Sequence, residues 1–600
     1  MGLFSPRKVM TRLYIPQTTR QETQTASSGV GLRLLLALIL AFGAISASAL
    51  HAEDRPTAVL TESTYEVDGP FFDGDRLVYP EGAWVPRHEL EVERTFRETH
   101  PRGAPRAVTP PPTGPVHCVA EYEPMEGILM SWEIPTGSGW DTILKNLALH
   151  ITTNAASQGA KVYMVVDTTS ERTTVQSALT SWGVNMSKVE FVVRITDSIW
   201  IRDYGPRYIY QGACRAVVDH DYNRPTRNDD DAFPSYFAPY KKHAFYEHQL
   251  VHGGGNYHLD ALNRAYATEL IWNENPGLSH QQIHDIWEDY QNVDTHIFPP
   301  FPTSVDLTQH LDMWMQVMAD DKVMISDWPN NVGSTQDVIC DNAAVFMANR
   351  GYTVYRVPAR SISGVHYTYT NVVMCNDLVI IPSYTNATVS PHNAPALAAW
   401  QAALPGKTIV QVNAQSIVGA SGVFHCIVMH VPRHLGGVNP TVYMLNHRGG
   451  EVLTPGNNVD IRWISDDEVG TTNVDILLST NGGFSYDTLI AAATADDGLF
   501  TWNVPDIYTT QARIRVMARN AAMKTGEDQS DSNLTIVGTP LIGDLNCDVK
   551  VDLDDVPPFV TALLTPALFN DCNFNAADMN ADTFVDALDV AGFVEALLAP

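Results

Sequence analysis

Apolar and polar residues follow two different patterns along this 600-residue chain. Between residues 118 and 433, short apolar runs recur, and stretches with helical periodicity separate several of them. The predicted strands are 128–132, 161–166, 189–194, 322–326, 353–357, 378–381 and 408–412, and the predicted helices are 140–156, 171–182, 335–349 and 394–403. This order of elements predicts an α/β fold, although the irregular spacing leaves more than one sheet arrangement open.

A second pattern begins near residue 437, where apolar and polar residues alternate as they do in half-buried strands. The alternating segments are 459–463, 474–478, 499–503 and 512–516, with turn residues between them at the spacing of a sandwich. We therefore expect an all-β, Ig-like sandwich over residues 437–538, with Trp463 and Trp502 in its core.

The last segment, 541–600, contains an internal repeat: residues 544–555 correspond to 578–589, and a helical stretch follows each. Oxygen ligands at loop positions 1, 3, 5, 9 and 12, with a main-chain carbonyl at 7, suit a hard cation such as Ca²⁺. The predicted ligands are Asp544, Asn546, Asp548, Lys550, Asp552 and Asp555 in the first loop, and Asp578, Asn580, Asp582, Phe584, Asp586 and Asp589 in the second. A merely solvated acidic tail is the alternative.

The pair of loops resembles a dockerin module, which also has Asp at position 12. The resemblance implies a small α-helical module with structural Ca²⁺ and a cohesin-like docking partner. Position 6 departs from the usual glycine, because Val549 and Thr583 stand there.

Residues 1–52 have the composition of a targeting segment. Basic residues precede an apolar run of about 12 residues, shorter than the roughly 20 of a membrane span, and Ala47-Ser48-Ala49 offers a cleavage site. We expect a cleaved signal peptide and a secreted, periplasmic or cell-surface protein without a membrane contact after cleavage, with an uncleaved anchor as the alternative. Residues 53–115 are polar and Pro-rich, which predicts a linker or pro-segment without a firm fold.

The net charge limits the class of partner, and the number of cysteines limits which thiols can pair. The net charge of −30 argues against nucleic acid as a partner, because no basic stripe is present to neutralise phosphates. Seven cysteines, an odd number, leave at least one thiol free or paired outside the chain, whereas Cys547 and Cys572 could pair within the tail.

Four short constellations in the α/β region carry candidate chemistry. They are Trp200-Ile-Arg-Asp203-Tyr-Gly-Pro206, which follows the apolar run 189–195 that we expect to be a buried strand, then His310-Leu-Asp312, Asn371 and His425-Cys426. Each has a structural alternative when taken singly. Asp203 could pair with Arg202, and Cys426 could be an inert core thiol. His310 could be structural, and Asn371 could cap a turn.

Taken in order, with residues 121–129 (EYEPMEGIL) and Gly254-Gly-Asn-Tyr257, these motifs resemble the family of agmatine deiminases and bacterial, Porphyromonas-type peptidylarginine deiminases. The resemblance covers about half the chain. It implies that residues 116–434 form a pentein-type catalytic domain, a five-fold pseudosymmetric α/β propeller of ββαβ units.

The resemblance also implies roles. Cys426 would attack the guanidinium carbon as a thiolate, and His310 would protonate the departing ammonia and then activate water. Asp203 and Asp312 would grip the guanidinium, Asn371 would orient groups near the nucleophile, and Trp200 would wall the pocket and stack on the side chain. No cofactor is needed for this catalysis.

The residues after Asp203 bear on the substrate. Arg224, helped by Arg227, would clamp the α-carboxylate of a C-terminal arginine; alternatively both belong to a surface loop and pair with the acids at 229–231. We therefore expect an exported protein-arginine deiminase that acts on peptides or proteins and forms citrulline and ammonia through a Cys thiouronium intermediate. An agmatine or free-arginine deiminase, an amidinotransferase and a non-catalytic adhesion or scaffold protein are the alternatives.

Overall fold

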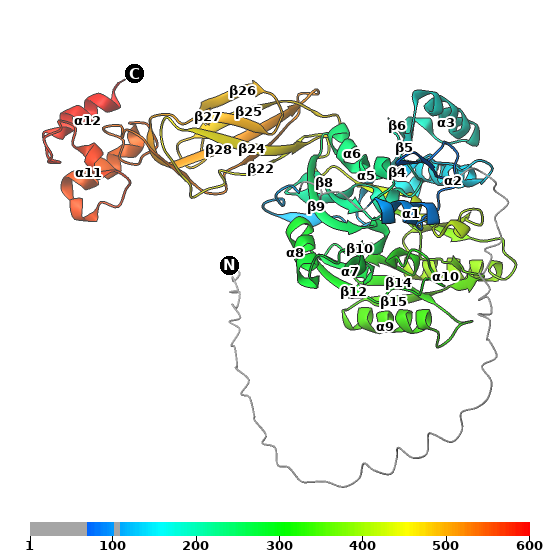
Figure 1. Ribbon diagram of the computed structural model, residues 1–600. Coiled ribbons are helices and arrows are strands. Elements are labelled where there is room, and N and C mark those ends of the chain that lie inside the picture. The colour runs from blue at the N-terminus through cyan, green and yellow to red at the C-terminus, as the bar shows by residue number, and fades with distance from the viewer. Residues whose placement is uncertain (1–68, 101–107, 600) are drawn as a thin grey trace, which may run out of the picture. The chain divides into compact units, whose positions relative to one another are not determined.

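The computed structural model describes residues 69–100 and 108–599 (Figure 1). The predicted signal segment, 1–52, lies outside the described residues. Within them, no helix combines the length and the apolar character that a membrane span requires.

The α/β region consists of repeated modules in which two antiparallel strands are followed by a helix and a parallel strand. These are the ββαβ units that the resemblance implies. The first module contains β21 (Met429–Pro432), β4 (Met125–Ser131), β5 (Lys161–Val166) and β6 (Val189–Val193), with α2 (Trp140–Thr153) and α3 (Thr169–Trp182). Because β21 comes from the end of the region and pairs with β4 at its start, the two ends of the catalytic region meet in one sheet.

Four further modules follow in the described chain. The second has β3 (Val116–Cys118), β7 (Arg207–Gln211), β8 (Cys214–Tyr222), α6 (Phe233–Lys241) and β9 (Ala244–His252); the third has β10 (Tyr257–Leu259), β11 (Arg264–Thr268), α7 (Leu270–Glu274), α8 (His280–Gln291) and β12 (Asp294–Phe298). The fourth has β13 (Met315–Ala319), β14 (Lys322–Asp327), α9 (Thr335–Asn349) and β15 (Thr353–Pro358); the fifth has β18 (Val373–Cys375), β19 (Leu378–Ser383), α10 (Asn393–Ala403) and β20 (Thr408–Asn413), after the hairpin β16 (Arg360–Ile362) and β17 (Val365–Tyr367).

Local sequence explains where several helices begin and end. Thr168 accepts the main-chain N–H of Glu171 at the start of α3, and Gly183, with φ of 90°, ends that helix in the left-handed region. Ser279 and Gln282 form a reciprocal cap at the start of α8. These caps supply partners for main-chain groups that the helix itself leaves unpaired.

One strand differs from our expectation. The run 189–195 was expected to be a buried strand, but β6 is the outer strand of its sheet, and Val193 and Ile195 are 37% and 51% exposed. The strand has a neighbour on one side alone, so part of its apolar surface stays in contact with water.

The segment 53–115 also differs, because residues 69–100 have a defined fold. They form the hairpin of β1 (Phe71–Asp73) and β2 (Arg76–Val78), then an extended stretch and α1 (Glu91–Thr99). In Figure 1 this blue segment lies against the cyan and green elements of the catalytic region. The expectation of no firm fold was wrong here since its order comes from distant contacts, and we call residues 69–100 the strap.

Residues 441–537 form two sheets around one apolar core, so the all-β expectation is correct for this region. One sheet has β22 (Thr441–Met444), β24 (Asn458–Asp466) and β27 (Leu499–Asn503); the other has β23 (Val452–Leu453), β30 (Leu534–Val537), β28 (Tyr508–Asn520), β25 (Thr471–Ser479) and β26 (Thr488–Thr494), with β29 (Thr525–Gln529) beside β28. Trp463 and Trp502 are buried in this core, as expected. The Ig-like class stays a prediction.

The tail carries two loop–helix repeats, with helices α11 (Val556–Leu564) and α12 (Asp589–Leu597). Phe559 and Phe593, one from each helix, stack with their rings 3.9 Å apart in a small shared core. A disulfide joins Cys547 and Cys572, so this pair does form, whereas the other five cysteines are free and buried.

Candidate active site

The candidate catalytic residues lie on the short connections that join one ββαβ module to the next. Asp203 stands on α4 (Ile201–Tyr204) between β6 and β7, and His310 and Asp312 stand at or beside the 3₁₀ turn between β12 and β13. Asn371 precedes β18, and Cys426 lies in the turn between β20 and β21. Repetition of the module therefore brings residues that are far apart in sequence to one place.

The structure fills this place with an arginine of the same chain. Arg87, from the extended part of the strap, is fully buried and sends its guanidinium between the two acids. Its Nε and Nη2 donate to the two carboxylate oxygens of Asp203, at 2.8 Å each. Its Nη1 and Nη2 donate to Asp312 at 3.0 and 2.9 Å. Two bidentate carboxylates thus hold one planar cation, which is the geometry expected for guanidinium recognition.

The thiol of Cys426 lies against the same group. Its Sγ is 2.7 Å from Nη1 of Arg87, and Nη1 is bonded to the central guanidinium carbon. Asn371 donates from Nδ2 to this sulfur at 3.1 Å, and its Oδ1 accepts the main-chain N–H of His425 at 2.9 Å. Asn371 therefore positions both the sulfur and the turn that carries it.

His310 approaches the guanidinium at a different nitrogen. Its Nδ1 is 2.7 Å from Nη2 of Arg87 and 3.4 Å from Asp203. Its Nε2 is buried without a hydrogen-bond partner. Within the described site, sulfur and imidazole therefore meet different guanidinium nitrogens.

Gly255, from the Gly-Gly-Asn-Tyr motif, completes the grip on the cation. Its main-chain N–H donates to Asp203 at 3.1 Å. A side chain at this position would place its first carbon 1.9 Å from Nη2 of Arg87, so the site requires a residue without one. The sequence supplies glycine where a main chain approaches a bound group.

Behind the acids lies a charged network that sequence reasoning missed. His425 contacts Asp312 through Nδ1 and Glu121 through Nε2, both at 2.8 Å, and Arg202 donates to Glu121 at 2.8 Å. Arg202 therefore pairs with Glu121, not with the adjacent Asp203. The position of Glu121 in the first motif and the His-Cys pair were visible in the sequence, but their contact spans some 300 residues and left no local signal.

Burial and charge shift the pKa values of the pocket in opposite directions. Burial alone would raise the pKa of Asp203, but Arg87 and His310 outweigh it, and the pKa lies well below its ordinary value. Asp312 is shifted down in the same way, with Arg87 as the main opposing charge. Burial raises the pKa of Cys426 well above that of a free thiol, while Arg87 acts to lower it. The pocket thus arranges two carboxylates with lowered pKa values and a thiol with a raised pKa around one cation.

The predicted substrate-binding residues contact the main chain of the strap. Trp200 donates from Nε1 to the carbonyl of Val85 at 2.8 Å, a hydrogen bond to the peptide, whereas its stacking on the substrate side chain stays a prediction. Arg224 donates to the carbonyl of Arg87 at 3.1 and 3.3 Å. Both arms that we expected around a substrate therefore reach the segment that carries Arg87.

Arg227 has a different environment from the one expected. It forms a buried pair with Glu93 of α1, at 2.7 and 3.1 Å, and donates to the carbonyl of Pro86 at 2.8 Å. The alternative in which it pairs with the acids at 229–231 of a surface loop is wrong, because the residue is fully buried against the strap.

Metal ligation has two candidate places. Glu121, His258 and His425 place three ligand atoms within 4.8 Å, the one such group among the described residues. Two of these residues are already engaged with Arg202 and Asp312, so we assign them to the charge network above.

The tail loops show matching geometry. Asp544 accepts two main-chain N–H groups of its own loop, and Asp578 does the same at the equivalent position of the second loop. Val549 and Thr583 adopt φ of 70° and 76°, the left-handed turn that glycine favours, so the loops keep the turn despite the substitution. Burial, with neighbouring carboxylates, raises the pKa of Asp544 to about 7. These features fit a cation held by the twelve predicted ligands, which stays a prediction.

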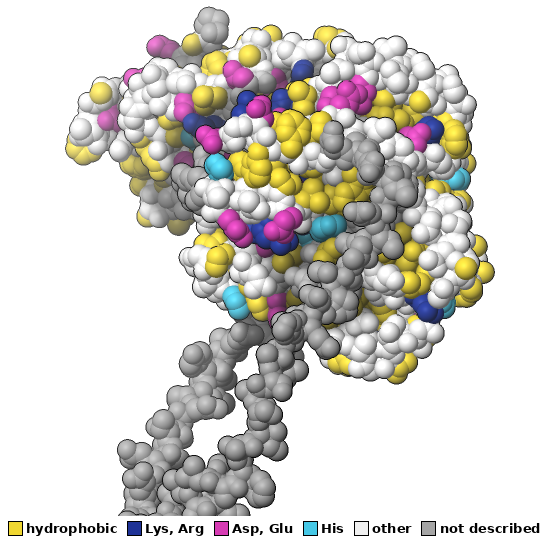
Figure 2. Space-filling model, turned by 45° about the vertical axis from the view of Figure 1, so that its right-hand side comes forward, with side chains coloured by type: hydrophobic (Ala, Val, Ile, Leu, Met, Phe, Trp, Pro, Cys, Tyr) yellow, Lys and Arg dark blue, Asp and Glu magenta, His cyan; other side chains and the backbone are white. Residues whose placement is uncertain are grey.

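Surface charge agrees with the composition. Figure 2 shows Lys and Arg in small groups interspersed with acidic and apolar side chains on that face. An extended basic track, as nucleic-acid binding would require, is not seen on the face drawn.

Comparison with known proteins gives one family-model match, the Porphyromonas-type peptidyl-arginine deiminase, over residues 117–432. Agmatine deiminase from Pseudomonas putida is 23% identical over 286 residues, which cover 40% of this chain and 76% of that protein. Among solved structures, agmatine deiminase of Enterococcus faecalis (19% identity, TM-score 0.46) covers 55% of this chain and 100% of its own. The C. jejuni agmatine deiminase with substrate bound (17% identity, TM-score 0.45) covers 54% and 97%.

Proposed function

Because the chain belongs to the Porphyromonas-type peptidyl-arginine deiminase family, whose members act on amidines, we propose that it deiminates peptidyl-arginine. The products are peptidyl-citrulline and ammonia, and the substrates are peptides or proteins, foremost those with a C-terminal arginine. The distinction between peptide and small-molecule guanidines is the proposed part.

One observation carries this choice. An arginine that is part of a polypeptide occupies the pocket with its guanidinium bound on all three nitrogens, and the catalytic region meets its main chain as well. Arg224 reaches the carbonyl of Arg87, the position where a C-terminal arginine would carry its carboxylate. An arginine donor there suits a carboxylate and opposes the ammonium of agmatine.

The chemistry follows from the positions of sulfur and imidazole. The thiolate of Cys426 attacks the guanidinium carbon, and the bond from that carbon to Nη2 breaks as His310 donates a proton to the departing nitrogen. Water then adds to the same carbon while His310 takes its proton. The carbon–sulfur bond breaks, leaving citrulline and the thiolate.

Ionisation of the thiol depends on the substrate cation. Burial raises the pKa of Cys426, and Asp312 and Asp203 add to the increase, whereas the guanidinium beside the sulfur lowers it. The thiolate is therefore stabilised when a guanidinium is bound and disfavoured when the acids stand without a counter-charge. This limits reaction of the nucleophile with other electrophiles.

An agmatine deiminase is the second candidate. The observation that favours it is that the similar proteins described above are named agmatine deiminases. The two acids and the thiol would serve agmatine equally well, so the discrimination rests on what meets the other end of the substrate, and Arg224 is the residue that decides.

The direct test is citrulline formation from a short peptide that ends in arginine. We expect citrulline and ammonia in equal amounts with the unaltered protein and none with Cys426→Ala. Cys340→Ser is the matched control, since Cys340 is also buried and free but lies in α9, away from the pocket. No citrulline from any guanidine would contradict the enzyme assignment, and activity retained in Cys426→Ala would contradict the mechanism.

Three parts of the chain outside the catalytic region enter the proposal. We infer export to the periplasm, cell surface or medium through residues 1–52, from their composition. The tail loops are proposed to bind Ca²⁺ and to dock to a cohesin-like partner, supported by their repeated ligand pattern. The sandwich of residues 437–538 would then separate the enzyme from its attachment.

A further inference from the structure

The strap enters the pocket as a bound peptide would, and this carries an inference that rests on the proposed function. We propose that Arg87 is itself a deimination site: Cys426 of the same chain converts it to citrulline, and the strap leaves the pocket afterwards. The strap is thus the first substrate of the enzyme and, until it reacts, a competitor of every other substrate.

The main chain of the strap is recognised residue by residue. The carbonyls of residues 85, 86 and 87 each accept a hydrogen bond from a different side chain, Trp200 at 2.8 Å, Arg227 at 2.8 Å and Arg224 at 3.1 Å. The N–H of residue 87 donates to the carbonyl of Ala420 at 3.0 Å. Contacts to the peptide backbone do not depend on the neighbouring side chains. The pocket therefore accepts an arginine with chain on both sides.

The guanidinium of Arg87 has the contacts that the reaction needs. The sulfur of Cys426 is 2.7 Å from Nη1, His310 is 2.7 Å from Nη2, and two carboxylates fix the plane of the group. An arginine side chain that merely blocked the pocket would need contacts with the two carboxylates alone. The additional approach of nucleophile and imidazole to different nitrogens is the geometry of a substrate.

Deimination of Arg87 needs water as its one reactant from outside the protein. A bond forms between Sγ of Cys426 and Cζ of Arg87, and the bond from Cζ to Nη2 breaks, releasing that nitrogen with a proton from His310. Water then adds to Cζ and the carbon–sulfur bond breaks. In net terms, the arginine cation and one water give neutral citrulline and one ammonium ion.

The product fits the pocket worse than arginine does. The oxygen that replaces Nη2 faces Asp203 and Asp312, where the nitrogen donated hydrogen bonds. Both buried carboxylates then lose their main counter-charge, a costly change in a site that excludes water. Deimination of Arg87 therefore weakens the strongest hold on the strap.

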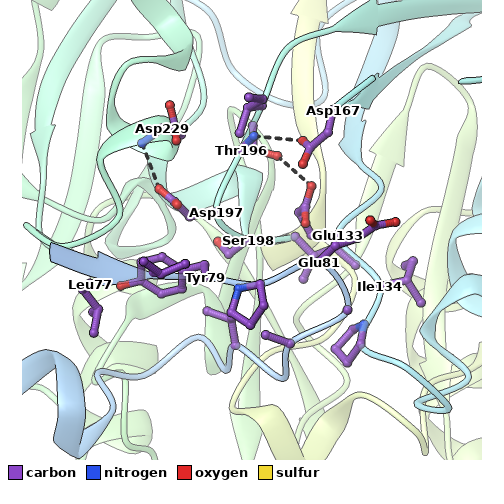
Figure 3. A pocket seen from close by; sticks show the side chains of 18 of the residues that line it. Leu77, Tyr79, Glu81, Glu133, Ile134, Asp167, Thr196, Asp197, Ser198 and Asp229 are labelled. Atoms are coloured by element: carbon purple, nitrogen blue, oxygen red, sulfur yellow. Dashed lines mark hydrogen bonds between the residues drawn. The ribbon is translucent and has the colours of Figure 1, made fainter. Parts of the chain in front are cut away.

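Part of the remaining contact surface is polar. Residues 76–83 and 85 of the strap line a polar cavity (Figure 3), into which Tyr79 and Glu81 of the strap and Glu133 and Asp167 of the catalytic region project. Carboxyl groups gathered under a strap favour hydration over apolar packing. The strap is held by specific polar contacts, and Arg87 makes most of those at the reactive end.

The experiment measures the state of residue 87 in the full-length protein. Unaltered protein and Cys426→Ala, with Cys426→Ser as a second inactive variant, are incubated at high dilution in water labelled with heavy oxygen. They are then denatured and digested with trypsin for mass spectrometry. We expect citrulline with one heavy oxygen at residue 87, and loss of tryptic cleavage there, in the unaltered protein alone. Arg94 and Arg97 of α1 are controls in the same segment, because both are half exposed outside the pocket, and they stay arginine.

A mixture separates reaction within one chain from reaction between chains. Isotope-labelled Cys426→Ala protein is incubated with unlabelled active protein, and conversion of Arg87 in the active chain alone supports the proposal. Equal conversion of Arg87 in the inactive chain overturns it.

A parallel assay keeps this test distinct from that of the function. The same samples are given an arginine-terminated peptide, and citrulline is measured. Arg87 that stays arginine while the peptide is turned over overturns self-deimination and leaves the proposed function standing. No product from either arginine contradicts the function itself.

Discussion

A substitution in the buried ion pair between Glu93 and Arg227 tests how the strap docks on the catalytic region. Glu93, on α1, is 1% exposed and holds Nε and Nη2 of Arg227 at 2.7 and 3.1 Å. Burial alone would raise the pKa of Glu93, but Arg227 outweighs it, so the pair is ionised. Glu93→Gln removes one charge and leaves the other buried, whereas opening of the strap exposes Arg227 to water. The substitution therefore penalises the docked state alone.

The expected size follows from what such pairs contribute. Removing one partner of a buried ion pair costs about 3–5 kcal/mol. Since roughly 1.4 kcal/mol corresponds to a tenfold change in an equilibrium constant, the docking equilibrium should shift toward the open state by about two to three and a half orders of magnitude. Because the strap competes for the pocket, affinity for an added peptide should rise by up to this factor.

The assay uses the Cys426→Ala background, in which Arg87 cannot react. Binding of a fluorescent, arginine-terminated peptide is measured by anisotropy with and without Glu93→Gln. Glu91→Gln is the matched control, since Glu91 lies on the same helix but is exposed and pairs with Arg94 at the surface. Such a surface pair contributes about 0–1 kcal/mol. Equal affinities for the Glu93→Gln and Glu91→Gln proteins would refute docking through the buried pair.

Three further outcomes are expected. Arg224→Ala should lower kcat/KM for arginine-terminated peptides by roughly tenfold or more, because one charge-assisted contact is lost. Agmatine turnover should stay unchanged, and equal losses for both substrates would contradict a carboxylate clamp at Arg224. Burial raises the pKa of Asp197, beside the cavity under the strap, from 3.8 to about 7. The docked state thus keeps a proton that the hydrated open state gives up, so docking should weaken as pH rises from about 4 through 7. Protease cleavage of the strap in Cys426→Ala protein measures this, and a flat profile over that range would contradict it. Calorimetry should find one Ca²⁺ per tail loop, with one site lost in each of Asp555→Asn and Asp589→Asn; no binding to the unaltered chain would contradict the calcium assignment.

Local patterns predicted the elements whose signal is local. The expected helix 335–349 is α9 itself, and the expected strand 161–166 is β5, because their periodicity matches their burial. Strands β7 and β8 were missed, since buried polar residues such as Arg215 and Asp219 interrupt the apolar run that marks a strand. The charged partners of Arg215, which are Glu126 and Asp466, come from other parts of the fold.

For the candidate site, too, some residues were predicted from the sequence and others were missed. Asp203, Asp312, His310 and Cys426 were found through the ordered set of motifs, which carries the resemblance, and the structure places them around one guanidinium. Arg87 was not found, because the segment around it has the composition of a linker. Its position is set by contacts with residues more than 100 positions away, which leave no trace in local periodicity.

The most direct test of the central claim compares two substrates of one enzyme. The protein with Glu93→Gln, in which the strap is open, is given an arginine-terminated peptide and agmatine in parallel, and kcat/KM is measured for each from ammonia release. Peptidyl-arginine specificity predicts a kcat/KM for the peptide at least roughly tenfold above that for agmatine, as one charge-assisted contact at Arg224 provides. Agmatine turned over with the higher kcat/KM would contradict it.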